Sequence, residues 1–408
     1  MSDIFSTKWL NQFNKEKPVF KFNFIKGLRF YRSSKLPIYI NVGRNLTKGI
    51  SYKLKKTEIE NLKNSVILIY DVPDYFDIDT SDLPYRLNIH RIKQYPGYLV
   101  NLKKYSDLQD YIQSIFSNKT RSKFKRYERR LELCFDISYK MFHGDITKEN
   151  YEFIFEKFKT LLEKRFTDKQ ITNNNLNPNE WAFYHDVAYP MILEKKAALF
   201  VVFENSNPIA ITFNYLSDNI LFHAITVFDT DYSKFHLGKV ALLNLFSWCF
   251  KNSIQVFDFS KGHFDYKTHW KDKCYDFDYH VYYNTTSLRS KITAFVILNF
   301  FLFKQFLRDR KVNLILHKLT YWFKNETKRI KSIPEFRFEE ITQPYKERDL
   351  LKIDFPSDGL SALKPAANEF LFLNREKLKD LDIFQLKNDQ SNYILKGKKV
   401  NRMLVVNK

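Results

Sequence analysis

The stretch from Asp258 to Lys273, DFSKGHFDYKTHWKDK, gathers side chains that can exchange protons or contact a polar ligand. It begins inside a short apolar run, SIQVFDFS, and contains Gly262, one of nine glycines among 408 residues. Glycine makes up about 7% of an average soluble chain, so a glycine in this chain should meet a need of the backbone. An apolar run that ends in glycine, aromatic, histidine and lysine residues indicates the edge of a binding site.

A second glycine stands before a strongly apolar run in KFHLGKVALL, residues 234–243. The first amide groups of a helix lack partners within the helix, and the helix dipole adds partial positive charge there, so a helix start attracts phosphate. We predict that Gly238 lets the backbone approach a phosphate closely and that Lys239 adds charge. A single glycine before a helix also occurs in ordinary turns, so this motif needs support from the elements around it.

A third segment, SNKTRSKFKRYERRLE at 117–132, carries seven basic residues and one acidic residue before Leu131. On a helix, Arg121, Lys125 and Arg129 share one face, while Phe124 and Tyr127 anchor the opposite side. The basic face is either a solvated surface or a phosphate-facing surface for a nucleotide-linked substrate or a nucleic acid.

The net charge of +21, from 67 basic and 46 acidic residues, favours partners that carry phosphate or a membrane surface. A compositionally biased genome also produces such a chain, because Lys, Asn, Ile, Phe and Tyr are over-used together. Charge alone therefore does not identify the partner.

Cys134, Cys249 and Cys274 have no metal-binding spacing and their number is odd, so we expect neither a metal site nor a disulfide framework. The first residues lack the apolar core of a signal peptide. The longest apolar run, AFVILNFFLF at 294–303, is about half the roughly 20 residues of a spanning helix. We expect a cytoplasmic protein, or one peripheral to the inner membrane.

Strand signals occur in two groups. The first group is PIYINV (37–42), SVILIY (65–70) and PGYLVNL (96–102). The second is AALFVVFE (197–204), IAITFNYL (209–216) and ILFHAITVFD (220–229), joined by short polar turns as in an antiparallel meander. The glycine loop, an apolar helix and the buried strand SIQVFDFS follow it. Between the groups, a helix carries His185, which is either a structural residue or a substrate ligand.

This order of elements, with SNKTRSKFKRYERRLE, FVVFENSNPIAITFNYL, FDTDYSKFHLGKVAL and FDFSKGHFDYKTHW, resembles the GNAT acyltransferase fold over about 95–275. These segments together look like the acetyltransferases of the CelD/BcsL type, associated with cellulose biosynthesis, a group that is itself similar to FemAB-like aminoacyl transferases with tandem GNAT units. The resemblance implies an α/β fold with a mixed, mostly antiparallel sheet flanked by helices. It divides the chain into an N-terminal GNAT-like half (1–110), a GNAT acyltransferase domain (111–283), a basic and apolar helical region (284–332) and a small C-terminal appendage (333–408).

The resemblance also assigns roles to residues. The pyrophosphate of acetyl-CoA, the co-substrate, would bind at His236, Leu237, Gly238, Lys239 and Val240. SIQVFDFS would diverge from its neighbouring strand to form the acyl-CoA cleft, with Tyr266 as the acid toward the thiolate. Acyl transfer to an amine needs a base, and the candidates are His223, Asp229 and Asp258. Substrate contacts would come from Arg121, Lys125, Arg129, Lys267 and Trp270. A structural carboxylate at Asp258, and packing roles for Tyr266 and Trp270, are the alternatives.

We therefore expect an N-acyltransferase, with acetyl as the acyl group, that acts on a small-molecule amine of a sugar nucleotide or surface-polysaccharide precursor. Two alternatives remain. One is a FemAB-like aminoacyl transferase, in which tRNA is the nucleic-acid partner. The other is a non-catalytic protein that contacts a membrane surface or acts as a scaffold through residues 284–332.

Overall fold

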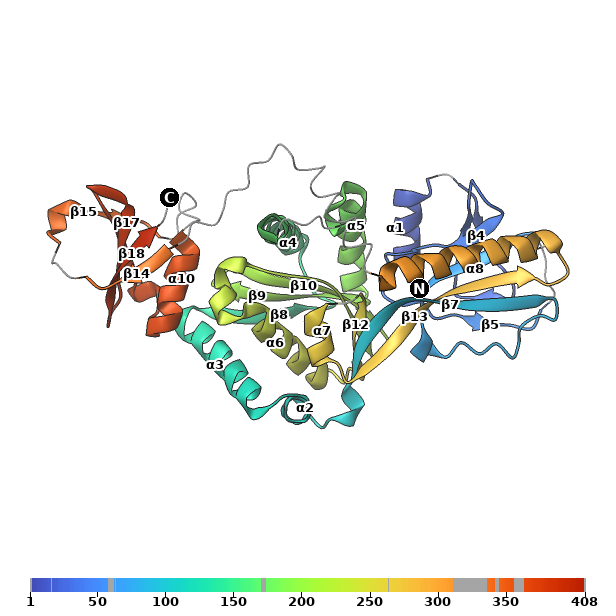
Figure 1. Cartoon of the computed structure of the whole chain (residues 1–408), viewed down its shortest axis with the longest axis horizontal. Coiled ribbons are helices and arrows are strands. Elements are labelled where there is room, and N and C mark those ends of the chain that lie inside the picture. Colours follow the sequence, from blue (N-terminus) through green and yellow to red (C-terminus); the bar gives the residue numbers. More distant parts are fainter. Residues whose placement is uncertain are drawn as a thin grey trace.

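The computed structural model describes residues 2–406 except 16, 58–61, 63, 170–173, 263, 311–335, 342–344 and 356–362. The chain forms one eleven-stranded sheet with helices on both faces and a separate five-stranded sheet at its C-terminal end (Figure 1). Residues 311–332 of the predicted helical region lie outside the described residues.

The N-terminal half holds one helix and a run of mostly short strands. Its elements are α1 (Asp3–Phe13), β1 (Val19–Phe20), β2 (Ile25–Lys26), β3 (Phe30–Arg32), β4 (Ile38–Asn41), β5 (Lys53–Leu54), β6 (Val66–Pro73) and the long strand β7 (Leu87–Asn101). The first group of predicted strands is thus confirmed in β4, β6 and the second half of β7.

The central part alternates helices with longer strands. Its elements are α2 (Leu108–Ile115), α3 (Asn118–Cys134), β8 (Ile137–Phe142), α4 (Lys148–Lys169), α5 (Pro178–Leu193), β9 (Ala197–Glu204), β10 (Asn207–Ser217), β11 (Ile220–Phe228), α6 (Leu237–Lys251), β12 (Val256–Lys261), α7 (Asp265–Trp270) and β13 (Lys273–Asn284). β9, β10 and β11 form the predicted antiparallel meander, since Asn207 of β10 opposes Glu204 and Ser217 opposes Ile220.

The eleven strands lie in the order β1-β3-β4-β6-β13-β7-β12-β11-β10-β9-β8. All neighbours are antiparallel except β4 with β6 and β11 with β12. β13 is the last element of the central part in sequence but pairs with β6 and β7, and the β7–β13 ribbon joins the two halves (Figure 1). The predicted mixed, mostly antiparallel sheet flanked by helices is confirmed.

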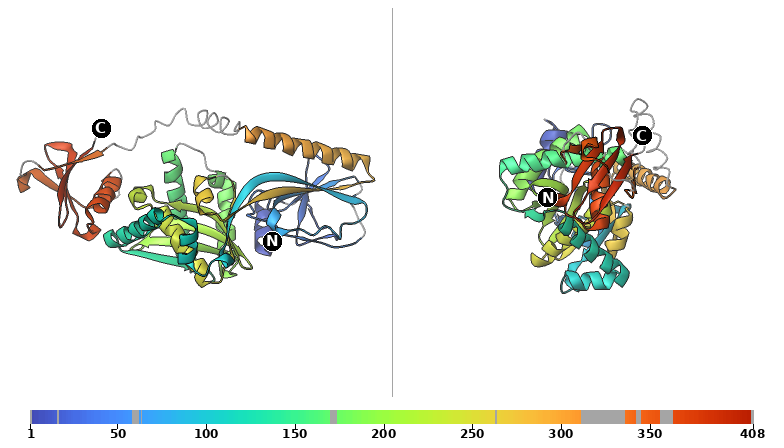
Figure 2. Two further views of the ribbon diagram at one scale, coloured as in Figure 1. Left: turned by 60° about the horizontal axis from the view of Figure 1, so that its bottom comes forward. Right: turned by 90° about the vertical axis from the view of Figure 1, so that its left-hand side faces the viewer.

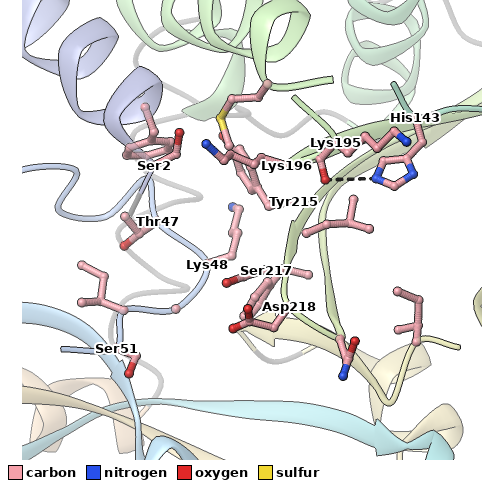
Figure 3. A pocket seen from close by; sticks show the side chains of 18 of the residues that line it. Ser2, Thr47, Lys48, Ser51, His143, Lys195, Lys196, Tyr215, Ser217 and Asp218 are labelled. Atoms are coloured by element: carbon pink, nitrogen blue, oxygen red, sulfur yellow. Dashed lines mark hydrogen bonds between the residues drawn. The ribbon is translucent and has the colours of Figure 1, made fainter. Parts of the chain in front are cut away.

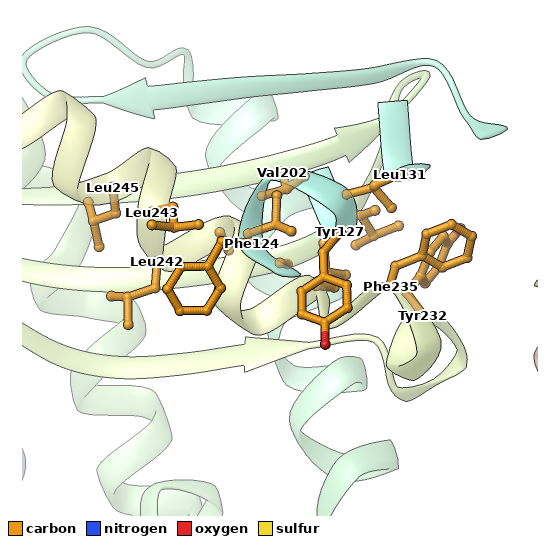
Figure 4. Close-up of a cluster of buried hydrophobic side chains, with 14 of the residues drawn as sticks. Phe124, Tyr127, Leu131, Val202, Tyr232, Phe235, Leu242, Leu243 and Leu245 are labelled. Atoms are coloured by element: carbon orange, nitrogen blue, oxygen red, sulfur yellow. The ribbon is translucent and has the colours of Figure 1, made fainter. Parts of the chain in front are cut away.

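Two cores cover the two faces of the central strands. One packs α4, α5 and α1 against β9, β10 and β11 through residues such as Phe158, Phe183 and Phe213. The other packs α3 and α6 through Phe124, Leu131, Phe246 and others (Figure 4). Periodic apolar residues of each helix thus face the sheet, as the sequence pattern requires.

The C-terminal part begins with α8 (Leu288–Asp309), which lies along the β7–β13 ribbon (Figures 1 and 2). The remaining elements are β14 (Phe336–Glu339), β15 (Leu350–Ile353), α10 (Leu363–Asn374), β16 (Asp382–Leu386), β17 (Asp389–Lys396) and β18 (Asn401–Val406). α10 is not a loose appendage, because Phe370 and Leu371 are buried in the same core as α3 and α6.

We expect Phe370→Ala to destabilise the central part by about 3 to 5 kcal/mol, the usual cost of removing a buried aromatic side chain. Phe370 has no exposed surface. Urea unfolding followed by the fluorescence of Trp248 and Trp270 measures the loss. Leu373→Ala on the same helix is the control, since Leu373 is 54% exposed. An unchanged tryptophan transition in Phe370→Ala would show that α10 is not coupled to the central core.

Candidate active site

The site begins where two parallel strands stop pairing. β11 and β12 pair only over Ile220–Phe222 and Val256–Asp258. The register of β10 against β11 then skips Ala224, which places a bulge in β11. A bulge bends its strand, so β11 turns away from β12 after this point. The divergence that the resemblance implied for SIQVFDFS is therefore present.

Gly262 ends β12 with a φ of +104°, and Ser260 before it has a φ of +60°. Both values lie in the left-handed region, which glycine adopts at little cost. This turn explains the glycine in DFSKGHF, because the chain must reverse from β12 into α7 directly beside the diverging strands.

Asp258 has no exposed surface and is held by three hydrogen-bond donors. The hydroxyls of Tyr75 and Tyr275 donate to its carboxylate at 2.7 Å, and the Ser260 amide donates at 2.6 Å. Burial raises its pKa to about 6, and these donors oppose the rise. The contacts favour the structural alternative, in which Asp258 anchors the turn.

Gly97 is required by this carboxylate site, although no sequence motif indicates its role. A Cβ atom at residue 97 would lie 2.2 Å from the ring of Tyr275. Only glycine lets that ring lie against β7, where its hydroxyl reaches Asp258.

Lys267 is buried, and its ammonium group lies on the turn after β12. Its Nζ donates to the carbonyl oxygens of Ser260 at 3.2 Å and Lys261 at 3.0 Å. Burial lowers its pKa to about 7, Lys48 lowers it further, and Asp258 opposes the change. Lys267 can therefore exchange a proton near neutral pH, which is typical of catalytic groups.

His223 lies directly after the last paired residue of β11 and is buried beside the rings of Phe257 and Phe259, at 5.6 and 5.9 Å. Burial lowers its pKa to about 3, and Lys267 and Lys48 add to the effect. The imidazole is thus neutral at physiological pH and a weak base.

Tyr266 lies in α7, directly after the turn that ends β12. The pKa of Tyr266 is raised to about 12, mainly by the poorly hydrated surroundings of its hydroxyl, and Arg165 opposes the rise. Its ring is 37% exposed and packs edge-on against Phe259. Tyr266 therefore keeps its proton at neutral pH and can donate it.

Two other predicted residues have structural partners. Asp229 forms a 2.6 Å ion pair with Lys164. Its carboxylate also accepts a hydrogen bond from the Asp231 amide and so caps the turn after β11. Trp270 is buried and stacks on Phe124 at 5.4 Å, which fits the packing alternative. His185, the other open assignment, pairs with Glu152 on the outer side of α5, and it lines a small surface hollow between α4 and α5.

At the N-terminus of α6, the cations Lys123, Arg126 and Lys239 gather around His236, and these four residues are called the α6 cationic cluster. His236 has a φ of +51°, and its ring lies 4.1 Å from that of Tyr127. Burial lowers the pKa of His236, and the other three members lower it further. Two members, Lys123 and Arg126, were missed because they come from α3.

Gly238 packs against the core at this helix start. A Cβ atom there would lie 2.6 Å from the ring of Phe228, so the glycine is needed for close packing. Leu237 and Val240 are buried, and the Val240 amide donates to the His236 carbonyl at 3.3 Å, so of these two residues only the Leu237 amide can face a ligand, whereas the Lys239 side chain is exposed. The other predicted basic residues lie elsewhere: Lys125 and Arg129 are exposed on the side of α3 opposite Tyr127, and Arg121 donates to the Gln113 carbonyl.

A cavity of about 670 Å³ lies between the N-terminal half and the central part (Figure 3). Thr47, Lys48 and Ser51 line one side, and His143, Tyr215 and Ser217 line the other. Burial lowers the pKa of Lys48 to about 8, and Lys261 contributes. Phe222, the last residue of β11 that pairs with β12, also lines this cavity, so the cavity adjoins the diverging strands.

The Tyr215 hydroxyl is buried at this cavity and has no hydrogen-bond partner among the described residues. A buried hydroxyl without a partner is costly, so a ligand that supplies one would bind favourably. No group of acidic, histidine or cysteine residues within the described ranges could hold a metal ion.

Comparisons with known proteins agree with this geometry. The family described as "Acetyltransferase (GNAT) domain" matches residues 118–268. A search of curated proteins found no match.

Three similar solved structures are distant. The chain is 11% identical to L-PGS from Bacillus licheniformis (TM-score 0.42; 74% of this chain and 96% of that one). It is 10% identical to FemX (TM-score 0.40; 62% and 83%). It is 8% identical to a tandem GNAT protein from the clavulanic acid biosynthesis pathway (TM-score 0.34; 63% and 78%). The segment from 118 to 268, which contains the diverging strands and the cationic cluster, is thus similar to the GNAT acetyltransferase domain.

Proposed function

We propose that this protein is an acyl-CoA-dependent N-acyltransferase, with acetyl as the acyl group, that acts on an amine of a sugar nucleotide or surface-polysaccharide precursor. The main support for this proposal is the opening between β11 and β12, where Lys267 has a pKa of about 7. The nature of the acceptor rests on the resemblance to CelD/BcsL-type proteins.

The proposed reaction forms a C–N bond and breaks the C–S bond of the thioester. The acceptor ammonium first loses a proton to neutral Lys267, and the free amine attacks the carbonyl carbon. The nitrogen, which still carries one extra proton after the attack, releases it to solvent as the C–S bond breaks. The leaving thiolate takes the proton of Tyr266, and Lys267 returns its proton to Tyr266 through solvent. A base near neutral pH and an acid that stays protonated are what this sequence of steps needs.

Binding of the two substrates is assigned to two places. The pyrophosphate of the acyl donor fits the α6 cationic cluster, because free amides and the helix dipole add to its charge. The acceptor fits the cavity of Figure 3, where Lys48 can pair with a phosphate and the Tyr215 hydroxyl can form a hydrogen bond.

Aminoacyl transfer from charged tRNA is the second candidate. The exposed basic residues of α3, which include Lys119, Lys123, Lys125, Arg126 and Arg129, form a surface that suits a nucleic-acid backbone. Transfer from aminoacyl-tRNA without any acyl-CoA would identify this activity.

We expect the double variant Lys123→Gln/Arg126→Gln to bind acetyl-CoA about 100-fold more weakly, because each lost contact to a charged group costs about 1.5 to 3 kcal/mol. Calorimetry with acetyl-CoA measures the affinity. The matched control is Lys125→Gln/Arg129→Gln, which removes the same charge from the opposite side of α3 and should change the affinity less than about twofold. If Lys125→Gln/Arg129→Gln weakens binding and Lys123→Gln/Arg126→Gln does not, the phosphate contact belongs to the face of Arg121, Lys125 and Arg129.

Lys267→Gln should lower kcat by about 10² to 10⁴ while acetyl-CoA binding is kept. Because the base must be neutral, the wild-type kcat/KM should rise with pH through about 7 and level off above it. The variant should lose this rise. Lys273→Gln is the control, since Lys273 is exposed on the next strand. A variant that keeps both the rate and the rise would place the base elsewhere.

Asp258→Asn should lower the free energy of unfolding by about 1 to 3 kcal/mol. The reason is that an NH2 group, which cannot accept a hydrogen bond, replaces one of the two buried carboxylate oxygens to which the surrounding groups donate. The Asp258 charge raises the pKa of Lys267, so its removal should shift the rise in kcat/KM to lower pH. The plateau rate per folded molecule should fall less than about tenfold. A plateau loss of about 10² or more, with no shift of the pH profile, would make Asp258 the general base.

A further inference from the structure

The outward face of α8 is apolar along the whole helix. Its exposed large side chains are Leu288, Ile292, Phe295, Val296, Phe300, Leu302, Phe303 and Phe306. Phe295 is 64% exposed and Phe300 is 60% exposed. An exposed apolar strip of this extent indicates an interaction surface.

The opposite face of α8 holds the helix on the sheet. Phe301 stacks on Tyr279 with ring centres 3.8 Å apart, and the Ser290 hydroxyl donates to the Ser65 carbonyl at 3.0 Å. Near the other end, the Arg308 guanidinium lies 3.5 Å from the centre of the Tyr95 ring and donates to the Gln94 carbonyl. The helix is thus fixed at its start, middle and end.

α8 is long and apolar enough to cross a membrane, and it is the one such helix in the described ranges. Spanning would require it to leave the sheet and expose Ala294, Ile297 and Phe301, which are buried in the N-terminal half. A helix held on a domain by one face can instead lie in the plane of the membrane surface, with its free face toward the lipid.

The charges on α8 indicate what covers the free face. Basic side chains stand at both ends, Arg289 and Lys291 in the first turn and Lys304, Arg308 and Arg310 in the last two. The one acidic residue of this helix, Asp309, is bonded to Gln305. An apolar strip with basic ends complements the acyl chains and anionic headgroups of a bilayer.

We propose that α8 docks the protein on an anionic phospholipid bilayer, with the helix axis in the membrane plane and the outward aromatic residues among the headgroups. This docking is independent of the chemistry proposed above. A second copy of the chain is a poorer occupant of the face, because two α8 helices in either direction would place basic ends against basic ends.

Sedimentation of the full chain with vesicles tests the proposal. Vesicles of phosphatidylcholine and phosphatidylglycerol in equal parts should bind the protein, and vesicles of phosphatidylcholine alone should bind it weakly. Phe295→Ser/Phe303→Ser should reduce the affinity by about 100-fold, about tenfold for each aromatic side chain removed from the interface. Lys291→Gln/Arg310→Gln should reduce it by about 30-fold, and high salt should weaken wild-type binding.

Matched controls lie outside α8. Tyr85→Ser/Leu351→Ser removes two exposed apolar side chains and Arg348→Gln/Lys352→Gln removes two exposed charges, and both should bind like wild type. All the changed residues are exposed, so circular dichroism should show intact folds. Equal binding by the α8 variants, or no binding of wild type to anionic vesicles, overturns the proposal. A wild-type dimer that Phe295→Ser/Phe303→Ser makes monomeric, without lipid binding, would assign the face to a second copy.

Discussion

The central constraint in this structure is the short pairing of β11 with β12, which ends at Phe222 and Asp258. Beyond these residues, buried backbone groups lose the partner strand that would satisfy them, and buried polar groups require partners. Side chains take over this task. The Asp258 carboxylate accepts from the Ser260 amide, and the Lys267 ammonium donates to the carbonyls of Ser260 and Lys261. The two charged residues of the proposed site are therefore also the residues that hold the opening.

The pKa values in the opening follow from the same arrangement. Lys261 forms a 2.5 Å ion pair with buried Asp71, which also accepts from Thr47 and Gln94. Lys48 and Lys267 have no carboxylate in direct contact among the described residues. Burial lowers the pKa values of both, and repulsion from Lys261 at Lys48 and from Lys48 at Lys267 lowers them further. Because Lys261 is paired with a carboxylate while Lys48 and Lys267 are not, the pKa values of Lys48 and Lys267 lie near neutral pH.

Much of the fold could be predicted because its signals are local. The strands of the meander and the turn at Gly262 follow from apolar runs and from glycine placement. The partners of the site could not be predicted, because Tyr75 lies 183 residues from Asp258 in sequence and no local pattern links them. Gly238 shows the limit of a motif, since close packing against Phe228 requires a glycine there whether or not phosphate binds. Helical periodicity likewise identifies the faces of α3, but only the position of α6 shows that Lys123 and Arg126 lie beside its N-terminus.

The inner face of α8 is connected to the proposed site by a chain of hydrogen bonds and an ion pair. Arg308 of α8 donates to the backbone carbonyl of Gln94, and the Gln94 side chain donates to Asp71 at 3.0 Å. Asp71 in turn holds Lys261, one of the charges that sets the pKa of Lys48. A helix whose inner face is tied to the site must keep its position, and an outer face free of such ties can bind lipid without disturbing it. The division of α8 into an anchored inner face and an apolar outer face therefore suits a protein that must dock and keep its opening in shape.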